Sequence, residues 1–101
     1  MKAKLFLHTK KEDRAGNITE IVLWKLPGTT PDRPHGIKYR CYHGDAKGRC
    51  IVRYDNESGK GDHKHVGDKE ITYKFKTAER LIRDFMDDIY DLTQNEGDDN
   101  E

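Results

Sequence analysis

Residues 37–54, IKYRCYHGDAKGRCIVRY, decide the fold. Apolar and polar side chains alternate on both sides of the glycine-bounded segment 44–48, which is the pattern of two half-buried strands joined by a turn. One face of this predicted hairpin is apolar and aromatic. The other face carries Lys38, Arg40, Tyr42, Arg49 and Arg53. The sequence therefore predicts one buried face and one basic, partly aromatic face that stays open.

Further strands are predicted on both sides of the hairpin. Alternation marks strands over 2–10, 18–26 and 71–75, and we expect Trp24 in the core. Apolar residues at helical spacing follow Thr77, a residue type that caps helices, and predict a helix to about Thr93. The polar, glycine-containing segment 55–68 predicts a long connection without a strand. These elements give an α+β fold: an antiparallel meander of about five strands with one C-terminal amphipathic helix packed on one face.

The chain length of 101 residues fits one domain, predicted over 1–94, and the acid-rich residues 95–101 are expected to form a disordered tail. All 19 Lys and Arg lie at or before Arg83 together with 11 acids, and the other eight acids follow, so the two parts carry +8 and −8. A basic body suits a protein that binds nucleic-acid phosphates. A charged tail that serves only solubility explains the same asymmetry.

Membrane and disulfide-rich classes do not fit the composition. No apolar run approaches the roughly 20 residues of a membrane-spanning helix, and the N-terminus lacks the cleavage site of a signal peptide. We therefore expect a cytoplasmic protein with no membrane partner. Cys41 and Cys50 lack the spacing of a zinc motif and are expected as free thiols.

The segment that folding explains least is 54–65, YDNESGKGDHKH, because turns use Gly, Asn and Asp but do not need His-Lys-His. A first interpretation is metal-independent phosphate chemistry, in which a histidine acts as base or acid and a cation stabilises the developing negative charge. The predicted catalytic residues are Lys60, Asp62, His63 and His65. The predicted nucleic-acid-binding residues are Lys38, Arg40, Arg49, Arg53 and Lys64.

A second interpretation of the same segment is a metal site. His63 and His65 point to the same side of an extended chain, and Asp55, Glu57 or Asp62 could complete the ligand set. A third interpretation is a solvated loop whose histidines only form hydrogen bonds, since clustered ionisable groups mark a site only in some proteins. The residues alone leave these three interpretations open, and we expect no cofactor and no bound metal.

The chain resembles the TumE-like toxin family over about residues 2–92. The resemblance rests on KAKLFLH at 2–8, IVLWKLP at 21–27, HGIKYR at 35–40, the polar segment at 54–65, and YKF at 73–75 with the helix that follows. It implies the toxin of a bacterial toxin–antitoxin pair whose partner is a helix-turn-helix antitoxin. Together with the basic body, it predicts action on RNA as a metal-independent ribonuclease. The alternative is a non-catalytic module that binds nucleic acid or the antitoxin through the basic sheet face.

Overall fold

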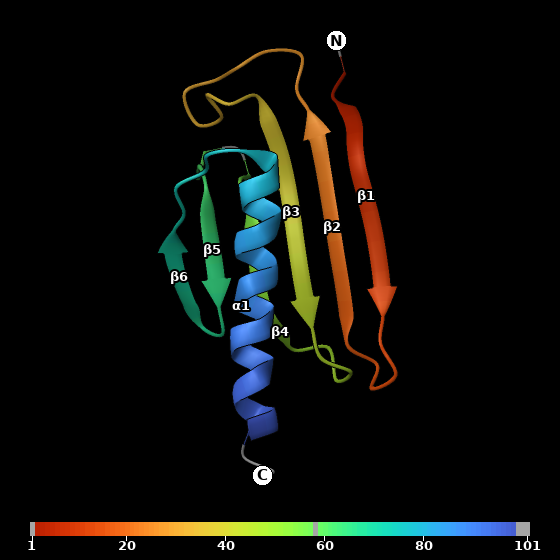
Figure 1. The fold of residues 1–101 in the computed structure, drawn as a ribbon. Helices are drawn as coiled ribbons and strands as arrows, with labels where there is room; N and C mark the ends of the chain where they lie inside the picture. The colour runs from red at the N-terminus through yellow and green to blue at the C-terminus, as the bar shows by residue number, and fades with distance from the viewer. Residues whose placement is uncertain (1, 58, 99–101) are drawn as a thin grey trace.

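The computed structural model describes residues 2–57 and 59–98. Over these residues the chain forms one antiparallel sheet in the order β1-β2-β3-β4-β5-β6, followed by the helix α1 (Figure 1). The α+β meander predicted from the sequence is therefore confirmed. The elements are β1 (Lys4–Glu12), β2 (Ile18–Lys25), β3 (Ile37–Gly44), β4 (Cys50–Asp55), β5 (His63–Val66), β6 (Lys69–Thr72) and α1 (Ala78–Asp98).

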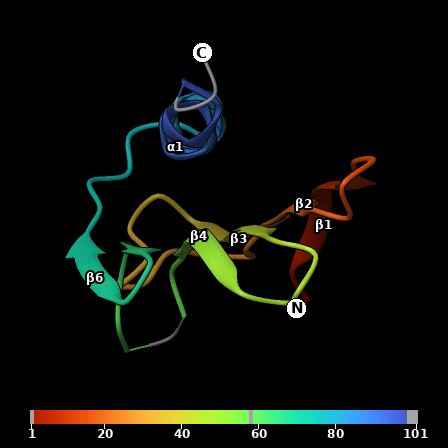
Figure 2. The same cartoon turned by 90° about the horizontal axis from the view of Figure 1, so that it is seen from below.

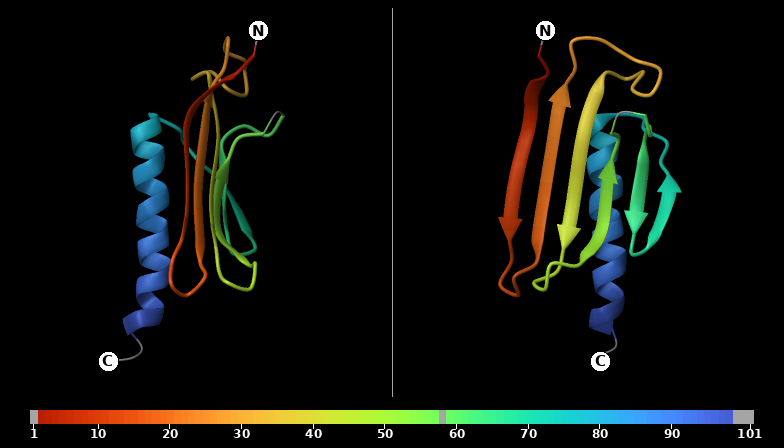
Figure 3. Two further views of the ribbon diagram at one scale, coloured as in Figure 1. Left: turned by 90° about the vertical axis from the view of Figure 1, so that its right-hand side faces the viewer. Right: turned by 180° about the vertical axis from the view of Figure 1, so that it is seen from behind.

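The helix α1 packs on one face of the sheet and leaves the other face uncovered (Figures 2 and 3). We call these the helix face and the open face. Alternation along the central strands sends Tyr39 and Cys41 into the core and turns Lys38 and Arg40 to the open face. The core between sheet and helix consists of Ile21, Leu23, Tyr39, Cys41, Val52, Tyr54, Leu81 and Phe85.

The central hairpin has the two predicted faces, with Cys41 opposite Tyr54 on the helix face and Tyr42 opposite Arg53 on the open face. The expected free thiols are both present: Cys41 is buried and Cys50 is half-buried. Burial raises the pKa of the Cys41 thiol to about 12, so this thiol is an unreactive part of the core.

Two predictions about the strands after β4 are wrong. The segment 55–68, expected to lack a strand, contains β5, and the strand expected over 71–75 is β6, which begins at Lys69 and ends at Thr72. A turn at Gly67, whose φ of +60° favours glycine, joins the two strands. The backbone of β5 pairs with β4 and β6, so the hydrogen bonds of the ladder hold it although its sequence, HKHV, is largely polar.

The helix begins as predicted and extends further. Thr77 caps it, because its Oγ1 accepts a hydrogen bond of 3.0 Å from the backbone N–H of Arg80. The predicted end near Thr93 is wrong: residues 95–98, expected as disordered tail, continue the helix, while 99–101 lie outside the described residues. Adding residues to an existing helix costs far less than starting one, so a polar sequence can extend it. The described chain has no helix of the length and apolarity needed to cross a membrane.

Candidate active site on the open face

The sheet register brings the side chains of three neighbouring strands together on the open face. Asp55 of β4 pairs with His63 of β5, and Arg53 pairs with His65. His65 in turn pairs with Glu70 of β6. One ligand atom each from Asp55, His63 and His65 lies within 4.8 Å of the others. We call these three residues the Asp55–His63–His65 cluster.

The shortest contact in the cluster joins two buried groups. His63 Nε2 lies 2.5 Å from Asp55 Oδ1, and the two side chains are only 6% and 8% exposed. The other ring nitrogen, His63 Nδ1, lies 3.0 Å from the backbone carbonyl of Gly61. A carbonyl oxygen only accepts hydrogen bonds, so Nδ1 carries a proton and donates it to Gly61. The imidazole is thereby fixed with Nε2 directed at the carboxylate.

Two atoms of the cluster are buried without a hydrogen-bond partner among the described residues: Asp55 Oδ1 and His65 Nε2. The 2.5 Å contact of Asp55 is thus an approach of two atoms and not a directed hydrogen bond. Arg53 Nε lies 3.0 Å from Asp55 Oδ2, and the half-exposed Glu70 places Oε1 3.7 Å from His63 Nε2 and 3.9 Å from His65 Nε2. Unpartnered buried polar atoms are costly and call for an explanation, such as a catalytic role or a bound water or ion.

A cavity of about 410 Å³ lies beside the cluster, and Asp55 belongs to both. Its volume is within the range of small-molecule and nucleotide sites. We call it the open-face pocket. It is lined by Trp24, Arg33, Lys38, Tyr39, Arg40, Asp55 and Glu57. Three cations, two carboxylates and an indole are therefore available to one ligand. This set suits a nucleotide, because the cations can bind its phosphates and the indole can stack on its nucleobase.

Three of these pocket residues were not predicted from the sequence as site residues: Trp24, Arg33 and the buried Tyr39. Trp24, expected in the core, is half-buried on the open face, where Lys38 Nζ lies 5.2 Å from its ring centroid. The signal for Trp24 was present, because it alternates with the buried Leu23 in a sheet that one helix can cover on one face only. Arg33 lies in the β2–β3 loop, where its Nε donates to the Asn56 carbonyl at 2.9 Å, and no sequence pattern marks it.

The structure brings several predicted residues to this face. Lys38 and Arg40 line the pocket, and Arg53 adjoins the cluster. Two of these positive charges are partly offset by carboxylates. Arg40 lies 3.8 Å from Glu20, and Arg53 lies 3.0 Å from Asp55. The predicted binding residue Arg49 lies at the β3–β4 turn, exposed and paired with Asp45 at 2.7 Å.

Lys60 is exposed in the β4–β5 loop, where its backbone N–H donates to the carbonyl of the pocket residue Glu57. In Figure 3 this loop projects away from the helix side of the sheet. The predicted catalytic lysine therefore belongs to the loop that borders the pocket.

Asp62 and Lys64 point to the helix face, because they alternate with His63 and His65 along β5. Asp62 Oδ1 accepts hydrogen bonds from Tyr39 Oη at 2.8 Å and from His35 Nε2 at 3.1 Å. Burial, and then the contact with Asp62, raises the pKa of Tyr39 far above its ordinary value, so the phenol keeps its proton. The structure therefore does not bring Asp62 together with the two cluster histidines.

Lys64 reaches the helix instead of the open face. Its Nζ lies 3.0 Å from Asp88 Oδ2, and the same carboxylate accepts a hydrogen bond from Tyr54 Oη. Burial, followed by the contact with Asp88, raises the pKa of Tyr54. The predicted binding residue Lys64 is thus separated from Arg40 and Arg53 by the sheet, and it offsets one of the acids of the helix.

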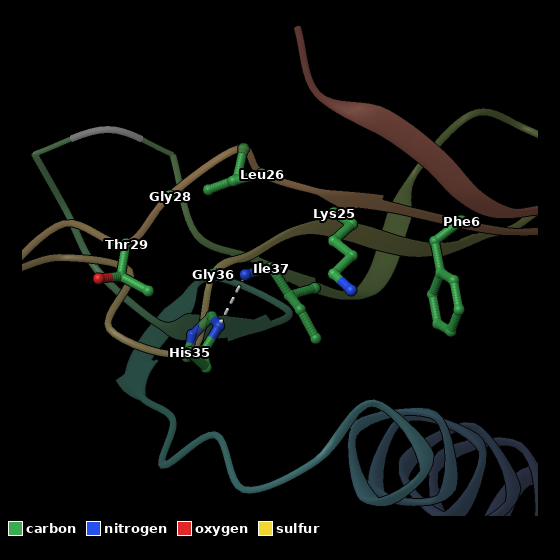
Figure 4. A pocket seen from close by; sticks show the side chains of 8 residues that line it. All are labelled: Phe6, Lys25, Leu26, Gly28, Thr29, His35, Gly36 and Ile37. Atoms are coloured by element: carbon green, nitrogen blue, oxygen red, sulfur yellow. Dashed lines mark hydrogen bonds between the residues drawn. The ribbon is translucent and has the colours of Figure 1, made fainter. Parts of the chain in front are cut away.

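A second cavity, of about 350 Å³, opens at the β2–β3 loop. Figure 4 shows the side chains of Phe6, His35 and Ile37 directed to the side on which the helix runs, with the backbone N–H of Ile37 bonded to His35 Nδ1 at 3.2 Å. This pocket is largely apolar and has no carboxylate in its lining. Its one imidazole, His35, has both ring nitrogens bonded within the protein, to Asp62 Oδ1 and to the Ile37 N–H, so we place the chemistry on the open face.

Comparison with known proteins gives one match. The family model described as Toxin TumE matches residues 3–93, which is most of the chain and includes the cluster and the open-face pocket. No curated protein and no solved structure matches the chain.

Proposed function

Because the chain belongs to the TumE toxin family, and is therefore the toxin component of a toxin–antitoxin pair, we propose that it acts on RNA as a ribonuclease. The observation that carries the proposal is the position of Asp55, which lines the cationic pocket and also contacts His63 at 2.5 Å. A phosphate held in the pocket would lie beside two imidazoles. Phosphodiester cleavage requires this combination of binding and proton-transfer groups.

In this proposal the open-face pocket binds a short single-stranded segment. The Trp24 indole offers a stacking surface for one base, and such stacking contributes about 1–3 kcal/mol. Arg33, Lys38 and Arg40 contact phosphates, with Lys60 approaching from the adjoining loop. A single strand is favoured over a duplex because its unstacked bases can reach a side chain on a sheet surface.

The chemistry follows from the group types present. The 2′-hydroxyl attacks the neighbouring phosphorus, an imidazole takes its proton, and an acid returns a proton to the departing 5′-oxygen. The products are a 2′,3′-cyclic phosphate and a free 5′-hydroxyl. Arg53 is placed to stabilise the charge that develops on the phosphoryl oxygens. That this cleavage proceeds without metal is the sequence-based prediction, and it stays a prediction.

The toxin family implies an antitoxin partner. We propose a helix-turn-helix protein in this role, as the resemblance suggests, and the sequence of the neighbouring gene tests this point. We place the pair in the bacterial cytoplasm, where messenger and transfer RNA are found.

One observation favours a non-catalytic alternative. His65 Nε2 is buried and the His63 side chain is 6% exposed, so a substrate reaches these nitrogens only after Glu70 moves aside. A module that merely holds RNA or the antitoxin on the open face does not need this movement. The two functions separate in a single comparison, because only the ribonuclease shortens the RNA that it binds.

Binding to a 2′-O-methyl RNA oligonucleotide, which has no free 2′-hydroxyl to attack, tests the pocket. We expect Arg40→Gln to weaken binding and to reduce the slope of log affinity against log salt by about 0.7, the value for one phosphate contact on a single strand. We expect Trp24→Leu to weaken binding roughly 5- to 150-fold with little change of slope, because stacking is uncharged. Fluorescence anisotropy between 50 and 200 mM salt, roughly the range in which phosphate contacts are lost, measures both quantities.

The matched control is Arg80→Gln, which removes an arginine from α1 where it pairs with Asp84 at 3.0 Å. This variant should bind as the wild type does. Equal losses in Arg40→Gln and Arg80→Gln would show that general charge, and not the open-face pocket, holds the RNA.

A further inference from the structure

We propose that the Asp55–His63–His65 cluster is a binding site for a divalent transition-metal ion of the zinc type. Two imidazoles and one carboxylate form a ligand set that leaves coordination positions open for water or substrate. The binding of the ion follows from the cluster alone, whereas its part in RNA cleavage rests on the proposed function. This inference departs from the sequence-based expectation of a site without metal.

The His63 imidazole is prepared as a ligand. Its Nδ1 donates to the Gly61 carbonyl at 3.0 Å, which leaves Nε2 as the ring nitrogen that faces Asp55 Oδ1 and is available to bind an ion. A ring nitrogen and a carboxylate oxygen 2.5 Å apart need a positive charge between or beside them, and either a proton or a metal ion supplies it. A hydrogen bond donated by the far ring N–H to a backbone carbonyl is a usual support of a metal-bound histidine.

The other two ligand atoms are those that the protein leaves unpartnered. Asp55 Oδ1 and His65 Nε2 are buried and have no hydrogen-bond partner among the described residues. The three ligand atoms lie within 4.8 Å of one another. A tetrahedral ion with bonds of about 2.1 Å needs its ligands roughly 3.4 Å apart, so the His63–Asp55 contact opens slightly and His65 moves inward.

The surroundings of the cluster fit a bound cation. Arg53 Nε lies 3.0 Å from the second oxygen of Asp55, a charge contact that stabilises the ionised carboxylate beside the imidazoles. Glu70 Oε1 is 3.7 Å and 3.9 Å from the two imidazoles, on a side chain that is 54% exposed and free to rotate toward an ion. The two carboxylates, Asp55 and Glu70, carry more negative charge than Arg53 offsets. This excess of negative charge favours a positive ion between the imidazoles.

The donor set decides the class of ion. Imidazole nitrogen is a good ligand for zinc and its neighbours, whereas magnesium and calcium select oxygen ligands. An ion held here lies beside Asp55 and hence at the edge of the open-face pocket. In that place it could polarise a phosphoryl oxygen of a bound RNA. With both imidazoles bound to the ion, the proton of the 2′-hydroxyl would pass to a hydroxide on the ion and not to an imidazole.

The test is a titration of EDTA-treated, dialysed wild-type protein with zinc chloride, without RNA, followed by calorimetry and by histidine side-chain NMR. We expect one equivalent to bind and the ring signals of His63 and His65 to shift, while the signal of His8 stays unchanged. His8 is the internal control, because it is exposed and does not belong to the cluster. Its Nε2 lies 2.8 Å from Glu20 Oε2. Magnesium chloride should shift none of the three.

Asp55→Asn, which keeps the shape of the side chain and removes its charge, should weaken zinc binding by about 100-fold. His8→Ala should not weaken it. Circular dichroism separates loss of the site from loss of the fold, and His65→Ala, which breaks no hydrogen bond in the described structure, serves if Asp55→Asn unfolds. Cluster signals that stay unchanged at excess zinc, or zinc binding that survives both substitutions, would overturn the proposal.

The failure of this inference is distinguishable from the failure of the proposed function. RNA cleavage that persists in excess EDTA, with no zinc bound to the cluster, would support the ribonuclease and contradict the metal site. Zinc bound to His63 and His65 in a protein that never shortens RNA would support the metal site and contradict the ribonuclease.

Discussion

His65→Ala abolishes growth arrest when the toxin is expressed in a host that lacks the antitoxin. This result is expected because His65 stands beside the Asp55–His63 pair, where it either transfers a proton or binds the ion. Loss of a general acid or base lowers the rate of a reaction by about 10²–10⁴-fold. His65 Nε2 makes no hydrogen bond within the described residues, so the substitution should leave the fold intact. Colony counts after induction, with protein levels checked by immunoblot, measure the effect.

The control for this prediction is His8→Ala, which also removes an imidazole from the open face. His8 is half-exposed, and within the described residues its one ion-pair partner is Glu20. It should arrest growth as the wild type does. If His65→Ala arrests growth equally well at the same protein level, then the cluster has no part in toxicity.

Asn56→Ala lowers the free energy of unfolding by about 3 kcal/mol. The Asn56 side chain is fully buried; its Oδ1 accepts from the Tyr39 backbone N–H at 3.0 Å, and its Nδ2 donates to the Ile37 carbonyl at 2.8 Å. Removing the amide leaves both backbone groups without a partner, and each such loss costs about 1–3 kcal/mol. Urea unfolding followed by circular dichroism gives the difference.

The control is Asn17→Ala, in which the lost amide bonds only the exposed Asp13 at 3.0 Å. Its expected cost is about 0.5 kcal/mol or less, as for other surface substitutions. Equal stability of Asn56→Ala and the wild type would mean that Asn56 does not hold the β3 backbone. The prediction matters for the site, because Asn56 lies between the pocket residues Asp55 and Glu57 and its carbonyl accepts from Arg33.

The central hairpin could be predicted because its sequence alternates without interruption. Ile37, Tyr39 and Cys41 face the helix as expected, and Lys38, Arg40 and Arg53 lie on the open face. The strand β5 could not be predicted, since three of its four residues are polar and its ladder hydrogen bonds leave no mark on side-chain periodicity. The same gap explains the misplaced start of β6.

Missing β5 had a direct consequence for the site. Read as a loop, the segment 62–65 places Asp62 with His63 and His65 in one predicted catalytic group and Lys64 among the predicted binding residues. As a strand, it sends His63 and His65 to one face and Asp62 and Lys64 to the other. The residues that then join the histidines, Asp55 and Glu70, come from neighbouring strands. Cross-strand neighbours depend on register, which only the folded sheet defines.

The most direct test of the account is incubation of purified toxin with a 5′-labelled single-stranded RNA, beside the same amounts of His65→Ala and His8→Ala. We predict shortened RNA that ends in a 2′,3′-cyclic phosphate for the wild type and His8→Ala, and intact RNA for His65→Ala. RNA that stays intact with wild-type toxin, in the presence and absence of added zinc, would contradict the claim that the open face cleaves RNA.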